Sequence, residues 1–163
     1  MNKFKLLFLL LVSIGIFFSG CEKKKIGEVE PIHWDRDMCE RCKMAISERK
    51  FAFEVVNPNN GKTYKFDDIG CAVLWMDEEK IPWKDKAILW ITDAKTGKWI
   101  NARTALYTDD SITPMAYGLA AYTKETKPKN HEIISFKDAI NTIYEVEKLN
   151  NKKLEEMKKK ADQ

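Results

Sequence analysis

The chain from residue 50 to residue 66 has the hydrophobic pattern of a β-hairpin. Residues 50–56 form a strand-like run in which Lys50 and Glu54 stand among apolar residues. Residues 57–61 contain Pro, Asn and Gly, which favour tight turns. Residues 63–66 then supply the return strand. The pattern therefore predicts two antiparallel strands joined by a short turn.

A helix and a buried strand are expected after this hairpin. Asp67 or Asp68 can cap the helix, and apolar residues then recur at helical spacing as far as about Glu79. The unbroken apolar run of residues 87–91 is typical of a strand in the centre of a sheet. Together with the hairpin, these elements predict a ββαβ unit.

The second part of the chain carries a similar pattern. Short strands are expected at residues 99–102, 119–123 and 131–135, with a polar, Pro-containing loop between the last two. Ser135 can cap a helix that runs from Phe136 to about residue 160. This pattern predicts a second unit that ends in a long C-terminal helix.

The long helix is expected to be buried over only part of its length. The apolar residues that form its predicted buried stripe are Ala139, Ile140, Ile143, Tyr144, Val146 and Leu149. Beyond this stripe only Leu154 and Met157 are apolar, so we expect the last two turns to stand off the body.

The two parts of the chain also repeat a weak residue pattern. Met44 and Met115 each precede a strand-like run, and Phe66 and Phe136 each open a helical pattern. Each methionine lies 21 or 22 residues before its phenylalanine, and the repeat period is near 70 residues. We therefore predict an α+β fold in which two homologous ββα(β)-type halves form one compact unit.

The N-terminus has the pattern of an exported lipoprotein. A short basic start precedes an apolar run from Leu6 to Phe18, which is too short to span a bilayer comfortably but suits a secretory signal. Residues 18–21 resemble a bacterial lipobox, and we expect acylation of Cys21. A plain signal peptide cleaved near Gly20, with Cys21 left as a thiol, is the alternative.

These patterns predict four segments. They are a signal peptide at residues 1–20, a lipidated N-terminus and tether at 21–33, a first half at 34–94 and a second half at 95–163. The mature protein is expected in the cell envelope, lipid-anchored and facing the periplasm. Without residues 1–20 the 28 basic residues fall to 26, against 25 acidic ones, and this balance argues against nucleic acid as a partner.

Residues 39–44 place two thiols and a thioether within one short motif. Thiolate and thioether sulfur are soft ligands, which select Cu(I) over hard cations. Met115 lies in a polar loop, and it would add a second thioether if the two halves pack so that the methionines meet. The sequence therefore predicts a Cu(I) site with Cys39, Cys42, Met44 and Met115 as candidate ligands.

Other residues leave the ligand set and the state of the thiols open. Cys71 lies on the apolar stripe of the first helix, which favours a buried, inert thiol, but it is also the most plausible third thiolate. His33 could swing in as a ligand, although a surface histidine is more common. A Cys39–Cys42 disulfide is the alternative to the metal site in an oxidising compartment.

The sequence favours a binding protein over an enzyme. It contains none of the common hydrolase motifs and no phosphate-binding glycine loop. The pair Asp67-Asp68 is explained by helix capping and the helix dipole. A zinc site is disfavoured because no second pair of Cys or His ligands exists. The alternative function is a thiol–disulfide oxidoreductase that uses the two cysteines of the motif, and a structural lipoprotein is a weaker third reading.

Three blocks of the chain resemble the signature blocks of NosL lipoproteins, which are nitrous oxide reductase accessory proteins. The blocks lie at residues 37–46, 64–71 and 113–122, in the family's order. The resemblance extends from about residue 34 to residue 140. It implies two homologous ββαβ halves and a membrane-anchored periplasmic Cu(I) chaperone. Such a chaperone would pass copper to the assembly proteins of nitrous oxide reductase, an enzyme of denitrification.

The resemblance also implies a ligand set. Carried over position by position, the ligands are Cys42, Met44 and Met115, with Cys39 close to them. Lys43 departs from the family pattern, which commonly has Gly between the Cys and the Met. A Lys there restricts the turn and places a positive charge beside the metal.

Overall fold

The computed structural model describes residues 25–161. The predicted signal peptide and the predicted acylation of Cys21 lie outside the described residues. Among residues 25–161, none of the helices combines the length and the apolar character that a bilayer crossing requires.

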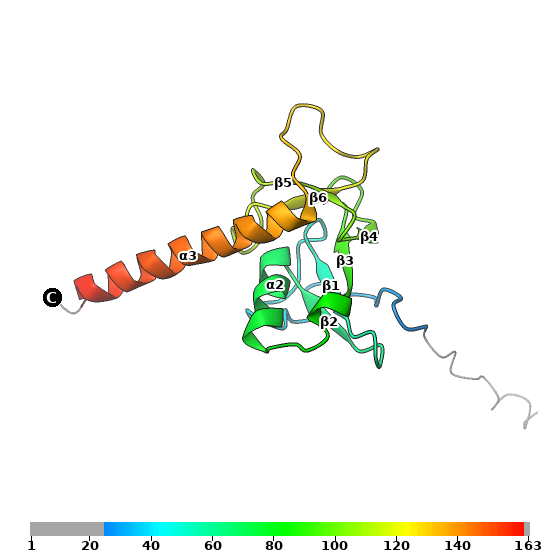
Figure 1. The fold of residues 1–163 in the computed structure, drawn as a ribbon, viewed down its shortest axis with the longest axis horizontal. Coiled ribbons are helices and arrows are strands. Elements are labelled where there is room, and N and C mark those ends of the chain that lie inside the picture. Colours follow the sequence, from blue (N-terminus) through cyan, green and yellow to red (C-terminus); the bar gives the residue numbers. More distant parts are fainter. Residues whose placement is uncertain (1–24, 162–163) are drawn as a thin grey trace, which may run out of the picture.

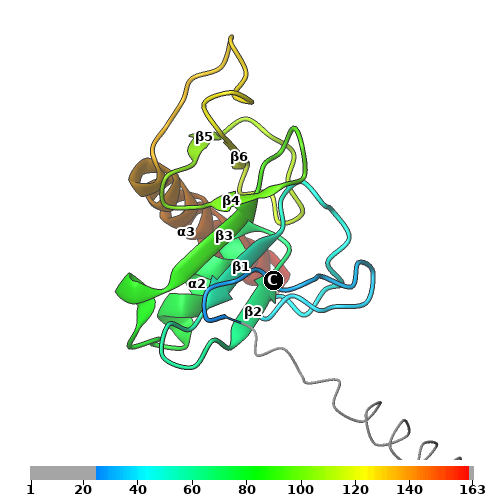
Figure 2. The ribbon, with the colours of Figure 1, turned by 90° about the vertical axis from the view of Figure 1, so that its right-hand side faces the viewer.

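A four-stranded antiparallel sheet forms the centre of the molecule (Figures 1 and 2). Its strands are β1 (Phe53–Val56), β2 (Thr63–Phe66), β3 (Ile88–Thr92) and β4 (Trp99–Asn101). The strand order is β2-β1-β3-β4, so β1 and β3 are the inner strands. The apolar run at 87–91 thus forms an inner strand, as its lack of polar residues predicted.

Helix α2 (Ile69–Glu78) packs against this sheet. Asp68 caps it, since its side chain accepts a hydrogen bond from the Gly70 N–H at 2.9 Å. The rings of Tyr64 on β2 and Trp75 on α2 have centroids 4.6 Å apart, and this contact helps to hold the helix against the sheet. A short 3₁₀ helix, η2 (Lys84–Lys86), leads from α2 into β3.

A second, two-stranded sheet lies beside the first. Its strands are β5 (Leu106–Thr108) and β6 (Ala120–Tyr122), which pair antiparallel. A parallel bridge between Asp93 and Ala121 connects β6 to the end of β3. The small sheet thus extends the molecule from the carboxyl end of β3.

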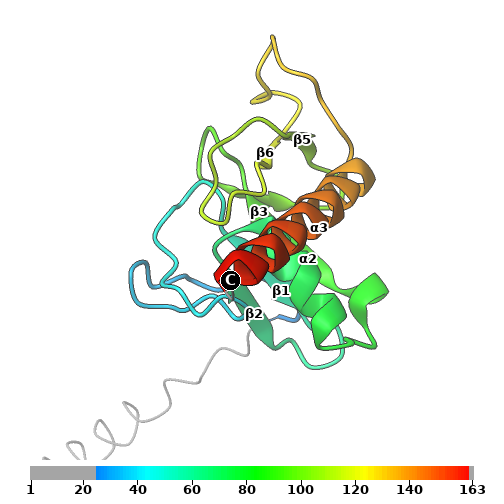
Figure 3. The same ribbon diagram turned by 90° about the vertical axis from the view of Figure 1, so that its left-hand side faces the viewer.

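Helix α3 (Phe136–Ala161) crosses α2 and then extends away from the body (Figures 1 and 3). The Ser135 hydroxyl accepts a hydrogen bond from the Asp138 N–H at 3.3 Å, which confirms the predicted cap. Where the two helices cross, the Tyr144 hydroxyl donates to Asp77 on α2 at 2.6 Å. From residue 148 to residue 161 every side chain is exposed, so the end of the helix stands off the body as predicted.

The predicted α+β class with a long C-terminal helix is confirmed, and the first half has the predicted order β1-β2-α2-β3. The second half differs from the prediction. The predicted strand at 99–102 forms β4, which pairs with β3 of the first half. The predicted strand at 131–135 is reduced to a single bridge between Ile134 and Tyr107 on β5.

Strand β5 itself was not predicted. It lies between β6 and Ile134, which belong to the two segments predicted as strands at 119–123 and 131–135. Its partners, β6 and Ile134, are distant in sequence. Its position is therefore fixed by tertiary pairing rather than by a local signal.

The predicted stripe of α3 is only partly buried. Ala139 and Ile143 are buried, whereas Tyr144 is 39% and Leu149 is 58% exposed. The helix leaves the body after Val146, so apolar residues beyond that point find no partner among the described residues. The prediction that Leu149 is buried was wrong for this reason. The prediction that Tyr144 is buried was also wrong, because Tyr144 lies at the edge of the contact with α2, where its hydroxyl bonds to Asp77.

Candidate metal centre

Four side chains gather where the CxxC loop meets the start of α2. They belong to Cys39, Cys42, Asp67 and Cys71, and their ligand atoms all lie within 4.8 Å of one another. Two atoms bound to one ion at about 2.3 Å can be at most about 4.6 Å apart. A contraction of a few tenths of an ångström therefore allows these atoms to share one ion. All three thiols are free.

Backbone hydrogen bonds bring the CxxC loop to this place. The Cys39 N–H donates to the Met44 carbonyl at 2.8 Å, which closes the loop on itself. The Glu40 N–H donates to the Lys65 carbonyl on β2 at 2.9 Å. Because Asp67 follows β2 directly, this second bond holds the loop against the residues that lead into α2.

Lys43 closes the loop in a left-handed conformation, with φ of 59°. This conformation is costly for a residue with a Cβ atom and is adopted readily by Gly. Its ammonium group pairs with Glu40 at 3.3 Å, but this ion pair is exposed and contributes little.

Replacing Lys43 by Gly should therefore keep or raise stability. We expect Lys43→Gly to change the free energy of unfolding by between 0 and about +1 kcal/mol in denaturant titrations, because relief of strain offsets the added freedom of the unfolded chain. Lys50→Gly is the matched control, since Lys50 is an exposed loop residue without a positive φ. It should lower stability, and a Lys43→Gly protein less stable than this control would contradict the strain at Lys43.

Asp67 and Cys71 reach the cluster from the beginning of α2. Cys71 is the third residue of the helix, and Asp67 directly precedes the cap residue Asp68. The N-terminal end of a helix carries partial positive charge, which stabilises thiolates near it. The Cys42 Sγ lies 3.6 Å from both carboxylate oxygens of Asp67 and donates its hydrogen bond to them.

The three thiols have different proton affinities. A hydrogen bond from the Cys71 thiol, with the backbone N–H groups of Asp67 and Cys42, lowers the pKa of Cys39 to about 7 against the opposing effect of burial. Burial raises the pKa of Cys42 to about 12. The hydrogen bond that Cys71 donates to Cys39 raises the pKa of Cys71, and burial adds to this.

A thiolate should therefore form near pH 7 in the metal-free, reduced protein. Because the pKa of Cys39 is lowered, its thiolate is populated above about pH 7, whereas Cys42 and Cys71 stay protonated to much higher pH. Thiolate ultraviolet absorbance of a Cys21→Ser protein should show one step near pH 7, and Cys39→Ser should remove it. A first step no lower than that of a free thiol would contradict this assignment.

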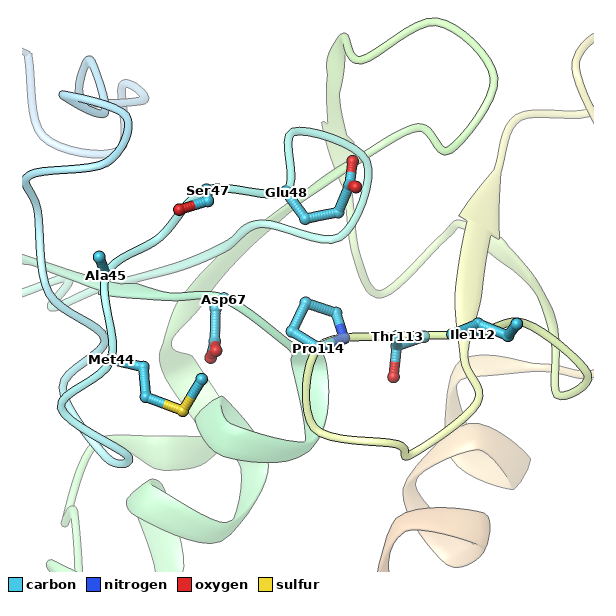
Figure 4. A pocket seen from close by; sticks show the side chains of 8 residues that line it. All are labelled: Met44, Ala45, Ser47, Glu48, Asp67, Ile112, Thr113 and Pro114. Carbon is cyan, nitrogen blue, oxygen red and sulfur yellow. The ribbon is translucent and has the colours of Figure 1, made fainter.

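Met44 stands at a pocket beside the thiols. The pocket has a volume of about 400 Å³, and its lining includes Met44, Asp67, Thr113 and Pro114. In Figure 4 the Met44 thioether and the Asp67 carboxylate both project into this space. The Met44 side chain is half-exposed. Asp67 therefore belongs both to the buried cluster and to the wall of an open pocket.

Met115 approaches the site with its backbone. Its N–H donates to the carboxylate of Asp68 at 3.3 Å, which places this loop at the start of α2. Its side chain is partly buried against the hydrophobic core. The binding of a metal by Met44 and Met115 stays a prediction, whereas Cys39 and Cys42 lie together as the motif predicted.

Two members of the cluster were not recognised as ligands in the sequence. The pair Asp67-Asp68 was explained by capping, but only Asp68 caps α2. Cys71 was expected to be a buried, inert thiol, and its role as a third thiolate was left open. Their spacing of four residues does not reveal the cluster, because Asp67 lies before the helix and a tertiary contact brings the CxxC loop to both residues. His33 lies outside the cluster, and its exposed ring contacts Asp37 at 3.4 Å.

Arg41 ties the CxxC loop to both helices. Its guanidinium group bonds to Glu78 on α2 at 2.8 Å, to Glu147 on α3 at 2.9 Å and to the Tyr117 hydroxyl at 3.1 Å. The Tyr117 hydroxyl in turn donates to Glu147 at 2.8 Å. Tyr117 belongs to the Met115 loop, so one charged network holds the thiol loop, the second loop and two helices together.

The fold is similar to that of a known metal-handling protein. No protein-family model matches the sequence, and no curated protein matches it. Among solved structures, the fold is similar to that of the copper chaperone NosL from Shewanella denitrificans, with a TM-score of 0.50 and 15% identity. The match covers 68% of this chain and 94% of that chain. The similarity confirms, at the level of the fold, the likeness to NosL predicted from the three blocks.

Proposed function

We propose that this protein binds Cu(I) in the periplasm and delivers it to the proteins that assemble the copper sites of nitrous oxide reductase. The main observation behind this proposal is the group of three free thiols within 4.8 Å of one another. The Met44 thioether stands beside this group at the pocket. Sulfur ligands of this kind favour Cu(I) over hard cations. The fold shared with a NosL copper chaperone supports the same conclusion.

The position of the thiols suits a carrier that exchanges its ion. Cys39 and Cys71 are buried, whereas Cys42 is half-buried and Met44 is half-exposed at the pocket. A partner's ligand could therefore approach the ion from the Met44 side while the buried thiols still hold it. Acyl chains on Cys21 would keep the protein at the membrane, where two or three chains give stable anchoring.

The arrangement of the thiols argues against a thiol–disulfide oxidoreductase. Such an enzyme needs an attacking thiol that is both accessible and deprotonated. Here the thiol with the lowered pKa, Cys39, is fully buried. The more accessible Cys42 has a raised pKa. We therefore favour metal binding over disulfide exchange.

Delivery is tested by the copper content of nitrous oxide reductase purified from cells that lack this protein. We expect a copper-deficient enzyme that the wild-type chain restores and a Cys39→Ser, Cys42→Ser chain does not. Full copper loading without the protein would rule out delivery to this enzyme, and it would leave Cu(I) binding itself to be judged by direct titration.

A further inference from the structure

We propose that Cys71 is the third ligand of the metal, so that Cu(I) sits in a three-thiolate site with the Asp67 carboxylate outside its coordination shell. This proposal rests on the proposed Cu(I) function and specifies the ligands that perform it. It assigns a metal-binding role to a residue that the pattern of the first helix marks as core filling.

The Cys71 thiol is directed at the other two sulfurs. Its Sγ lies within 4.8 Å of the Sγ atoms of Cys39 and Cys42, and it makes a hydrogen bond with Cys39. The side chain is fully buried, on the first turn of a helix whose other buried residues pack as core. A cysteine that only filled space would not need to face two further thiols.

Backbone groups around the cluster suit an anionic complex. One Cu(I) with three thiolates carries a net charge of about −2, and such a complex needs nearby donors to stabilise it. The backbone N–H groups of Asp67 and Cys42 favour the Cys39 thiolate, and the Met44 N–H favours the Cys42 thiolate. The N-terminal end of α2 adds partial positive charge beside Cys71.

Asp67 distinguishes Cu(I) from Zn²⁺ at this place. A carboxylate oxygen is a hard ligand, which Cu(I) does not select when sulfur is available. Zn²⁺ takes four ligands in tetrahedral geometry and accepts carboxylate oxygen with thiolates. Three thiolates complete the shell of Cu(I), whereas Zn²⁺ would need Asp67 as its fourth ligand. Asp67→Asn should therefore weaken Zn²⁺ binding by a larger factor than Cu(I) binding.

The first test measures Cu(I) affinity of the reduced full chain against a competing chelator. Even residues that only orient metal ligands cost 10- to 100-fold in affinity when they are replaced. Loss of a ligand in Cys71→Ala should therefore weaken binding at least about tenfold. Val73→Ala, a buried change on the same helix, is the control and should keep the wild-type affinity. Wild-type affinity in Cys71→Ala would overturn the proposal.

The second test counts the sulfur neighbours of copper by X-ray absorption, and it does not depend on the folding of Cys71→Ala. A Met44→Leu, Met115→Leu protein removes both candidate thioethers. We expect copper in this variant to keep three sulfur neighbours at about 2.3 Å and no oxygen neighbour. Two sulfur neighbours, or an oxygen at the metal, would overturn the three-thiolate site. A wild-type protein that bound no Cu(I) at all would instead refute the proposed function.

Discussion

Replacing both Cys39 and Cys42 by Ser should abolish tight Cu(I) binding. The change removes two of the three thiols in the cluster and puts hard hydroxyl oxygens in their place. Only Cys71 would remain among the clustered thiols, and one thiolate cannot enclose the ion. We expect the affinity to fall at least about 1,000-fold, which corresponds to about 4 kcal/mol.

Competition with a chelator of known Cu(I) affinity measures this loss. Met38→Leu is a matched control, because Met38 adjoins the motif, is exposed and lies outside the clustered thiols and carboxylate. It should bind Cu(I) as the wild type does. A double-Ser protein that kept the wild-type affinity would show that the metal is held elsewhere.

Replacing Gly70 by Ala should strongly destabilise the fold. A Cβ atom at Gly70 would lie 2.1 to 2.5 Å from atoms of the Tyr117 ring, far inside contact distance. Tyr117 is buried, and its hydroxyl is held by Arg41 and Glu147, so the ring cannot move without breaking this network. We expect the free energy of unfolding to fall by about 2–4 kcal/mol, measured by denaturant titration.

Making the same change in a Tyr117→Ala protein separates the steric clash with the Tyr117 ring from the intrinsic effect of Gly70→Ala on the helix. Ala is favoured over Gly in a helix by about 1 kcal/mol, so Gly70→Ala alone should be stabilising where nothing opposes it. In a Tyr117→Ala protein, the added methyl group has room, and Gly70→Ala should become neutral or stabilising. A Gly70→Ala change that stabilised the wild-type chain would contradict the close packing of α2 against the Met115 loop.

Local sequence signals were enough to predict the elements that local contacts hold. The hairpin of β1 and β2 has a clear turn, and the caps of α2 and α3 lie at Asp68 and Ser135 as expected. Strand β5 has no such signal, because it exists through pairing with β6 and with Ile134.

The candidate site was predicted only as far as it is local in sequence. Cys39 and Cys42 meet within one loop, so their spacing alone predicted the pair. Cys71 and Asp67 join them through a tertiary contact, the hydrogen bond between Glu40 and the β2 backbone, which no sequence pattern reveals. The predicted ligand set therefore combined the motif with Met115 and left open the role of Cys71, whose helix completes the thiol cluster.

The most direct measurement is a Cu(I) titration of the reduced protein in the presence of a competing chelator. One Cu(I) per chain, withdrawn from the chelator, is the expected result for a thiol cluster that closes around a single ion. A protein that leaves all of the Cu(I) with the chelator would contradict a copper site between the CxxC loop and the start of α2.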